Sequence, residues 1–364
     1  MRNKIKLYGN TPAIFYLGTK LLEAGYEIEC VAPVPRPKFG EMRSRPVRLS
    51  KSSCELIRKL YRTYRRPYFF LEEAPKLQTW GRLGSTKLSG SFDHSQNVDR
   101  WVDLELLRNE LKTCFVQAGG HLQVEESVFL PDSQNHRHLE VIDVLPEQLS
   151  KEQRHAYFPQ SRVRKKIQVA EFVLNGATDR ENGTPNLEFL KVENSLVFCE
   201  SLNDSKILTV FSASRYGRER VVNALKNPKA GVPIKWKAMI LRSSGYRQAE
   251  YAMLRGLSGF YRPGVIALGQ SLGSPSAISN LGVDYGLAQA SRAFERICSM
   301  TQRSSALLEA EDWRREESAA LLKGLRRGRM VENLLFKEQW AQGAKAQILT
   351  FLPPNVRSRF ASPV

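Results

Sequence analysis

The residue types that could do chemistry in this sequence lie first in a turn near the N-terminus. Gly9, Asn10 and Thr11 connect an expected strand at 4–8 to an expected amphipathic helix at 13–24. Such a turn presents backbone N–H groups at the start of a helix, and these groups bind phosphate when small residues let the ligand approach. The pattern therefore indicates a candidate phosphate site between a strand and a helix.

A second turn of the same kind occurs late in the chain. The apolar run 265–268 predicts a short buried strand that stops at Gly269, and a helix is expected to carry 287–297. The small and polar residues between them leave many backbone N–H groups for a phosphate or a flat polar ring. An ordinary strand-to-helix connection is the alternative, and composition alone favours it. The residues of this loop are Gly273, Ser274, Pro275, Ser276, Ser279, Asn280 and Gly282.

The first turn belongs to a strand, turn, helix, strand unit, because a second strand is expected at 27–31. This order is typical of the opening of a nucleotide-binding βαβ fold. The G-x-G-x-x-G fingerprint of that fold is incomplete, since Thr11 and Ile14 stand in place of its second and third glycines. Ala32 stands where an acid would hold a ribose hydroxyl. The sequence therefore predicts the architecture without the side chains that usually accompany it.

Length and composition set the outer limits. The chain has 364 residues, of which 42% are hydrophobic, enough for a large core and for two interleaved domains. The formal net charge of +18 is the unusual bulk property. This charge favours an acidic partner, whether a protein, a nucleic acid or a membrane surface.

Neither a metal site nor a membrane span is expected. The five cysteines are widely spaced and odd in number, which favours buried free thiols, and no histidine has metal-ligand spacing. No apolar run reaches the length of about 20 residues that a spanning helix needs. The N-terminus is typical of the start of a strand rather than of a signal peptide, so a cytoplasmic location is expected.

The densest positive charge lies in 33–66, which includes an expected helix at 50–64. A solvated helix face and a docking surface for an acidic partner both fit this pattern. The interleaved aromatic residues would suit single-stranded nucleic acid, although core packing is the simpler explanation for them. A second basic cluster at 314–329 adds to this weaker nucleic-acid hypothesis, which rests on charge alone.

Further strands and helices are expected along the rest of the chain. They are two short strands within 77–92, a helix at 103–118, a strand at 121–124, a strand pair with long loops within 132–161, a strand at 167–174 and two helices within 306–351.

The order of these parts resembles the flavin-dependent monooxygenase and tryptophan-halogenase-like superfamily. The resemblance rests on the βαβ unit, on Asp99 and Arg100 before a helix, on GATDR at 176–180 and on GQSLG at 269–273. It covers most of the chain as an ordered series of weak matches. Details such as QTWGRLG and NVDRWVDLELL are most similar to the flavoproteins that modify peptide tryptophan during quinone-cofactor maturation.

This resemblance implies an α/β chain in which a Rossmann-like FAD/NAD(P)-binding domain is interleaved with a β-sheet substrate domain and followed by a helical C-terminal region. It also implies FAD bound between the two domains, with reduced flavin activating oxygen. The expected domains are 1–75, 100–130 and 160–185 with 260–300 for nucleotide binding, 76–99 and 186–259 for the substrate, and 301–364 for the C-terminal helices.

The cofactor positions of the superfamily match this chain unevenly. Asp179 is displaced within the strand-end motif, and Gln270 stands where the superfamily has an aspartate. Positions that shape the scaffold are largely retained, whereas most side chains that would hold FAD have changed. The positions that the resemblance assigns to the cofactor are Gly9, Asn10, Thr11, Arg100, Asp179, Gly269, Gln270, Gly273 and Gly282.

Two functional hypotheses follow. The first is a FAD-dependent oxidoreductase or monooxygenase that oxidises a protein or a large aromatic substrate and holds FAD mainly through backbone contacts. The second is a catalytically degenerate, flavin-free member of the same fold that acts as a scaffold or binding partner. The sequence identifies no general base or nucleophile for either hypothesis, and it leaves both open.

Overall fold

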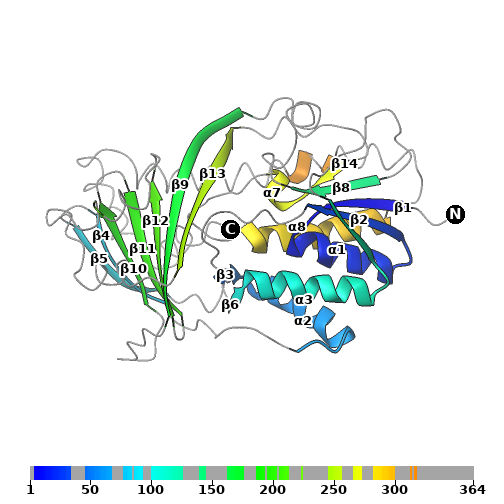
Figure 1. Cartoon of the computed structure of the whole chain (residues 1–364), viewed down its shortest axis with the longest axis horizontal. Helices are drawn as coiled ribbons and strands as arrows, with labels where there is room; N and C mark the ends of the chain where they lie inside the picture. Colours follow the sequence, from blue (N-terminus) through cyan, green and yellow to red (C-terminus); the bar gives the residue numbers. More distant parts are fainter. Residues whose placement is uncertain are drawn as a thin grey trace.

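Two β-sheet bodies lie side by side in the computed structural model, with a parallel sheet and its helices at one end and a large curved sheet at the other (Figure 1). The described residues are 4–33, 46–67, 77–83, 86–92, 100–125, 139–144, 162–175, 186–192, 195–202, 205–212, 223, 245–255, 265–272, 282–299, 312–313 and 315–317.

The first body is built on a five-stranded sheet in the order β14-β8-β1-β2-β7, and every neighbouring pair is parallel. Parallel strands are covered on both faces, so they carry nearly continuous apolar runs such as that of β14. This sheet confirms the predicted α/β, Rossmann-like fold class. Its strands are β1 (Lys4–Gly9), β2 (Glu27–Pro33), β7 (His121–Glu125), β8 (Leu139–Asp143) and β14 (Val265–Ala267).

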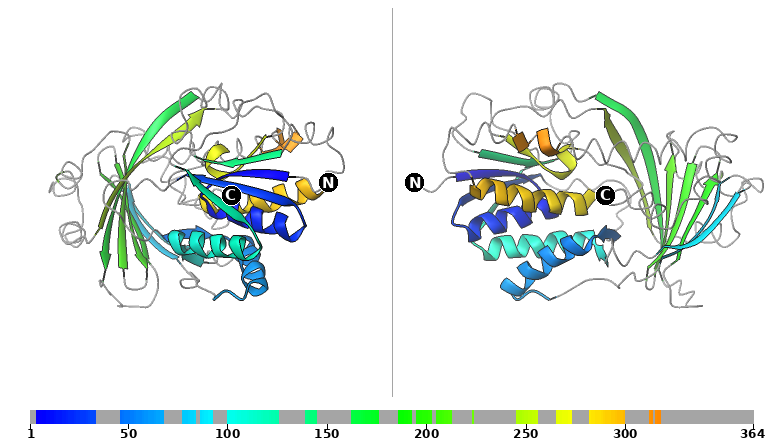
Figure 2. Two further views of the ribbon diagram at one scale, coloured as in Figure 1. Left: turned by 45° about the vertical axis from the view of Figure 1, so that its right-hand side comes forward. Right: turned by 180° about the vertical axis from the view of Figure 1, so that it is seen from behind.

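Three helices, α1 (Pro12–Glu23), α3 (Leu104–Gln117) and α8 (Gly282–Ser299), cover one face of this sheet (Figures 1 and 2). Helix α1 lies in the middle, and it contacts both α3 and α8. Gly18 allows the close packing, because a Cβ atom there would lie 2.8 Å from the Phe115 ring. Helix α2 (Lys51–Thr63) lies outside this layer, and its buried side chains complete the core.

The second body is a seven-stranded sheet in the order β13-β9-β12-β11-β10-β4-β5, antiparallel except for the pair β10 and β4. A short antiparallel pair, β3 (Pro46–Leu49) with β6 (Arg100–Asp103), is separate from both sheets. The strands of the large sheet are β4 (Leu77–Leu83), β5 (Thr86–Phe92), β9 (Arg162–Asn175), β10 (Asn186–Val192), β11 (Ser195–Leu202), β12 (Ser205–Ser212) and β13 (Gly245–Arg255).

One sequence-based domain assignment is wrong. The segment 160–185 was expected in the nucleotide-binding domain, but β9 pairs antiparallel with β12 and β13 in the large sheet. The strand that the parallel sheet takes instead is β8, from the region expected to be a strand pair with long loops. Strand β9 has 14 residues and mixes charged with apolar residues, which suits a long antiparallel strand with one face in the core.

The expectation of buried free thiols is confirmed for Cys30, Cys54 and Cys114, whereas Cys298 is exposed. Burial raises the pKa of the Cys30 thiol to about 12. In the part of the chain that the structure describes, no group of His, Cys, Asp or Glu could hold a metal ion. No helix of this described part has the length and apolar character to cross a bilayer. The expected C-terminal helices fall mostly outside the described residues.

Candidate functional site

The strand order creates one switch point, between β1 and β8 at the centre of the parallel sheet. From β1 the sheet grows through β2 to β7 in one direction, and from β8 it grows to β14 in the other. Ligands of open α/β sheets bind at such a point, in the crevice outside the carboxyl ends of the strands. Strands β1 and β8 end there together, because Gly9 is paired with Asp143.

Gly9 is required by this close approach of the two strands. Its φ angle is +147°, and a Cβ atom there would lie 2.4 Å from the Asp143 carbonyl oxygen. A carbonyl oxygen in the middle of a sheet cannot move away as a flexible side chain could. Gly9 therefore has a structural role that does not depend on any ligand.

Thr11 lies between the ends of β1 and β8 and the first turn of α1. It is the N-cap of α1, and its hydroxyl accepts a hydrogen bond from the Ile14 N–H at 3.3 Å. The same hydroxyl donates to the Asp143 carboxylate at 2.5 Å. Asp143 is only 2% exposed, so its carboxylate depends on such donors in place of water. The hydrogen bond between these side chains ties the end of β8 to the first turn of α1.

The second predicted turn starts at the same place. Gly269 begins the short helix α7 (Gly269–Leu272) with a φ angle of +46°, and a Cβ atom there would lie 2.9 Å from the Asp143 carboxylate. Its N–H donates to Oε1 of Gln289 on α8 at 2.7 Å. Ser271 Oγ accepts from the Val144 N–H at 2.8 Å and donates to the Val144 carbonyl. Both turns therefore pack against the end of β8.

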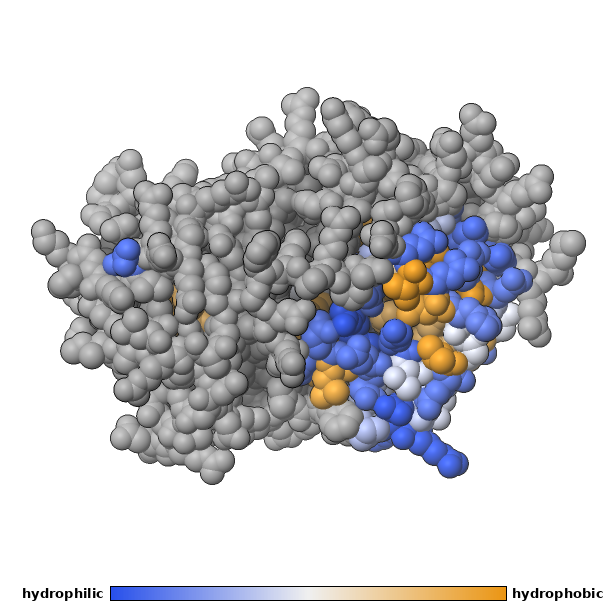
Figure 3. Space-filling view, viewed as in Figure 1, coloured by the Kyte–Doolittle hydropathy of each residue, from blue (hydrophilic) through white to orange (hydrophobic). Residues whose placement is uncertain are grey.

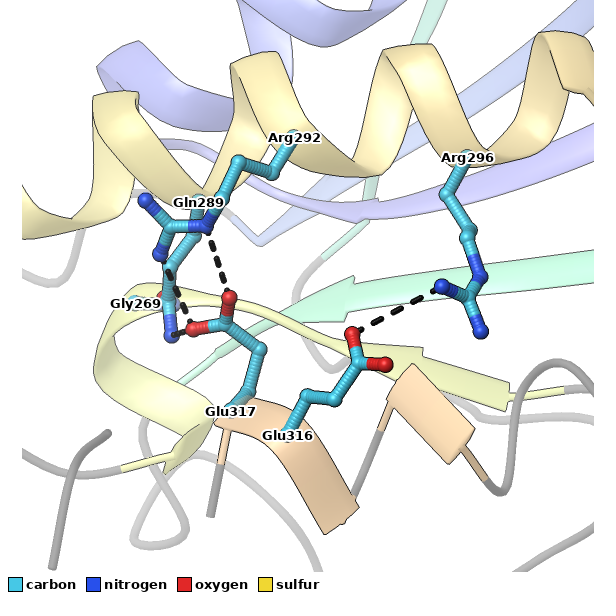
Figure 4. A network of polar contacts seen from close by, with 6 residues as sticks. All are labelled: Gly269, Gln289, Arg292, Arg296, Glu316 and Glu317. Atoms are coloured by element: carbon cyan, nitrogen blue, oxygen red, sulfur yellow. Dashed lines mark hydrogen bonds and ion pairs between the residues drawn. The ribbon is translucent and has the colours of Figure 1, made fainter. Parts of the chain in front are cut away.

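A network of polar side chains, with Gln289 and Arg292 on α8 and Glu317 further along the chain, lies beside Gly269 (Figure 4). Gln289 Nε2 donates to Glu317 at 3.0 Å, and Arg292 binds the same carboxylate through Nε at 2.7 Å and Nη2 at 3.0 Å. Burial lowers the pKa of Arg292, but the hydrogen bond and charge of Glu317 outweigh it, and the pKa is raised overall. The network therefore fastens the described segment 315–317 to α8.

The start of α8 also anchors α2. Asp284 is buried, and its Oδ1 accepts from both the N–H and the Oγ of Ser50 at 2.7 Å each. Ser50 is the N-cap of α2 and accepts from the Ser53 N–H. Helix α8 therefore contacts three parts of the chain: Gly269 at the switch point, Glu317, and Ser50 at the start of helix α2.

The structure brings together five of the predicted cofactor positions at the switch point, namely Gly9, Asn10, Thr11, Gly269 and Gln270. Of Gln270 only the backbone is described, within α7.

The remaining predicted positions are elsewhere or outside the described residues. Arg100 begins β6 and pairs with Leu49 in the two-stranded sheet, and its side chain is not described. Gly282 is the exposed first residue of α8. Asp179 and Gly273 lie outside the described residues.

Sequence reasoning missed Asp143, Gln289 and Glu317. It placed the acid of the strand-end motif at Asp179, after β9, but β9 does not belong to the parallel sheet. An acid that follows a short apolar run, as Asp143 does in LEVID, was the available signal. Gln289 and Glu317 gave no such signal, because helical polar residues are normally solvated.

Comparison with known proteins identifies the fold. No protein-family model and no curated protein match the chain. A crystal structure of CtdE in complex with FAD and a substrate matches 92% of this chain and 90% of CtdE, with a TM-score of 0.73 and 8% identity.

Two further solved structures agree with this result. PqsL, a probable FAD-dependent monooxygenase from Pseudomonas aeruginosa, matches 94% of this chain and 99% of its own, with a TM-score of 0.67 and 13% identity. The peptidyl tryptophan dihydroxylase QhpG, essential for tryptophylquinone cofactor biogenesis, matches 93% of this chain and 76% of its own, with a TM-score of 0.63 and 15% identity. The chain therefore has the fold of these flavoproteins.

The residues described at the switch point do not fit the pyrophosphate of FAD. The Ile14 N–H is bound to the Thr11 hydroxyl, and the Gly269 N–H is bound to Gln289. A buried carboxylate, that of Asp143, lies between the two turns. An anionic ligand needs donors that are open to it. No catalytic step is therefore assigned to FAD in this chain.

Replacing Gly9 with alanine should destabilise the fold by roughly 3 kcal/mol, because the new Cβ atom would clash with a backbone carbonyl oxygen. Gly25→Ala is the matched control, since Gly25 also has a positive φ angle but nothing lies within 4 Å of a Cβ atom there. Backbone strain alone should lower its stability by about 1 kcal/mol. Urea unfolding followed by circular dichroism measures both values, and equal losses would contradict the close approach.

Glu317→Gln should lower the free energy of unfolding by about 2 kcal/mol, because a buried carboxylate that binds Arg292 in two places loses its charge. Glu316→Gln should change it by less than about 0.5 kcal/mol, since the pair of Glu316 with Arg296 is longer, at 3.6 Å, and exposed. Urea unfolding of the two neighbouring variants compares them directly. A loss for Glu317→Gln no larger than that for Glu316→Gln would show that the bonds of Glu317 contribute no more stability than the exposed pair of Glu316.

Proposed function

We propose that this chain, which has the fold of the FAD-dependent monooxygenases, is a flavin-free binding protein whose partner is an acidic protein. The hydrogen bonding of the switch point carries the first part of the proposal. A resident dinucleotide needs backbone donors at the carboxyl ends of β1 and β14. Two donors there, the N–H groups of Ile14 and Gly269, bind side chains of the chain itself.

The charge of the chain supports the second part. Lys51, Lys59 and Arg62 are exposed on α2, with Arg65 directly after it, and Glu55 is the one acid within the helix. Figure 3 shows a mainly hydrophilic surface on the described part of this face, interrupted by separate apolar residues. Tyr61, in contrast, is buried in the core. The aromatic residue therefore supports packing, while the cations remain available to an acidic surface.

A flavin-dependent monooxygenase is the second candidate, and the match to FAD-bound CtdE over 92% of the chain favours it. In that case FAD would have to displace Thr11 and Gln289 from the two amides. The substrate would be a protein or a large aromatic compound, a class suggested by the peptidyl tryptophan dihydroxylase QhpG. Flavin binding separates the two candidates.

The purified protein, incubated with excess FAD and then desalted, should show no flavin absorbance. Its melting temperature should also be the same with and without FAD, because a ligand that does not bind the native state does not stabilise it. Absorption spectra and thermal melting make both measurements. Stoichiometric retained flavin would contradict the proposal and would establish the second candidate as the better one.

Neutralising three cations of α2 together, as Lys51→Gln, Lys59→Gln and Arg62→Gln, should weaken binding of an acidic polypeptide by about tenfold. Labelled polyglutamate is the probe, and fluorescence anisotropy at low salt measures the affinity. The reason is local: these side chains are exposed and lie on one helix.

The control removes the same amount of charge from β1 and α1 instead of from α2. Lys4→Gln, Lys6→Gln and Lys20→Gln change cations that already pair with acids, and polyglutamate affinity should fall by about twofold at most. Equal losses in both triple variants would show that only total charge matters. Tighter binding of a single-stranded oligonucleotide than of polyglutamate would favour a nucleic-acid partner instead.

A further inference from the structure

We infer that the switch-point site is self-liganded: the Thr11 and Gln289 side chains accept hydrogen bonds from two backbone N–H groups there, those of Ile14 and Gly269, that would otherwise be open to a phosphate. This inference rests on the proposed flavin-free function and goes beyond it by assigning the closure to named side chains. Two separate sets of contacts carry it, one on α1 and one on α8.

The first contact closes the N-terminus of α1. The Thr11 hydroxyl lies over the first turn, where it accepts from the Ile14 N–H. Its proton is directed to Asp143, and this bond fixes the rotamer of the Thr11 side chain. A glycine at this position would leave the first turn of the helix open to a ligand, because it has no side chain to act as a cap. The identity of residue 11 therefore decides whether the first donor is available.

The second contact closes the amide that follows β14. The Glu317 carboxylate can only accept hydrogen bonds, so the amide nitrogen of Gln289 faces it and the amide oxygen faces the Gly269 N–H. Gln289 is fully buried and Glu317 is 5% exposed, so water does not compete with these bonds. Arg292 holds Glu317 in place from α8 (Figure 4). The bond to Glu317 thus orients the Gln289 side chain so that its amide oxygen accepts from the Gly269 N–H.

Self-liganding removes the requirement for a cofactor in folding. A buried N–H group without a partner destabilises a protein, so an empty dinucleotide site normally leaves its donors to water or to the ligand. Here the N–H groups of Ile14 and Gly269 are bound within the chain. A phosphate that uses these groups must first break both bonds. FAD should therefore neither bind the wild-type protein nor raise its melting temperature.

The test reopens the donors by substitution. Thr11→Gly removes the cap from α1 and keeps the helix, because glycine is itself an accepted N-cap residue. Thr11→Ser is the matched control, since it keeps the hydroxyl on the Ile14 N–H. A double variant, Thr11→Gly with Gln289→Ala, opens the second donor as well. Equilibrium dialysis against FAD and against ADP measures binding, and far-UV circular dichroism verifies that each variant is folded.

The expected result is no detectable binding by the wild type or Thr11→Ser. Thr11→Gly should bind both FAD and ADP at least about tenfold more tightly than the detection limit of the dialysis, with a further gain in the double variant. Binding of ADP as well as FAD shows that the pyrophosphate is recognised rather than the flavin ring. If the wild type binds FAD, the proposed function fails and this inference fails with it. If neither the wild type nor folded Thr11→Gly binds either ligand, only the self-liganding inference is overturned.

Discussion

The approach of two backbone segments at the centre of the parallel sheet is the constraint on which the rest of the structure depends. Gly9 and Asp143 end neighbouring parallel strands, and the space between them admits no Cβ atom at residue 9. This approach brings the Asp143 side chain beside the turns that follow β1 and β14. A buried carboxylate requires donors, and Thr11 supplies one of them. The geometry of the switch point follows from satisfying this one charge.

Helix α8 links the switch point to the other helices of the first body through hydrogen bonds. Its first turn binds the N-cap of α2 through Asp284, and its middle binds Gly269 through Gln289. Gly286 of this helix faces Ala13 of α1, and a Cβ atom at residue 286 would be in van der Waals contact with the Ala13 Cβ atom. Glu317 then binds Arg292 of the same helix, which holds the segment 315–317 against α8. Buried polar groups would destabilise the fold if they had no partner, and here they pair with groups on elements distant in sequence.

The fold and the hydrogen bonds of the site favour different functions, a flavoenzyme and a flavin-free binding protein respectively. A fold shared with proteins under 25% identical limits the architecture but leaves the chemistry open, because function resides in particular side chains. At the switch point those side chains bind one another. On α2, in contrast, exposed cations face solvent. These exposed cations are the basis of the proposal that an acidic partner binds at α2.

The sequence alone determined the elements of the parallel body that are set by local patterning. The turn at Gly9, helix α1, strand β2 and helix α8 are confirmed near their expected positions, because apolar periodicity and glycine stops are local properties. The changed fingerprint at Thr11 and Ile14 was also readable, since it concerns residue types at fixed spacing.

Only the tertiary structure decided which strands share a sheet. The apolar pattern of β9 and that of β8 both fit a strand, but pairing between segments distant in sequence placed β9 in the large sheet and β8 beside β1. The partners of Asp143, Gln289 and Glu317 were decided in the same way, because a hydrogen bond across 132 or 28 residues leaves no local pattern. Local chemistry fixes the elements of this chain, and long-range packing fixes what its polar side chains bind.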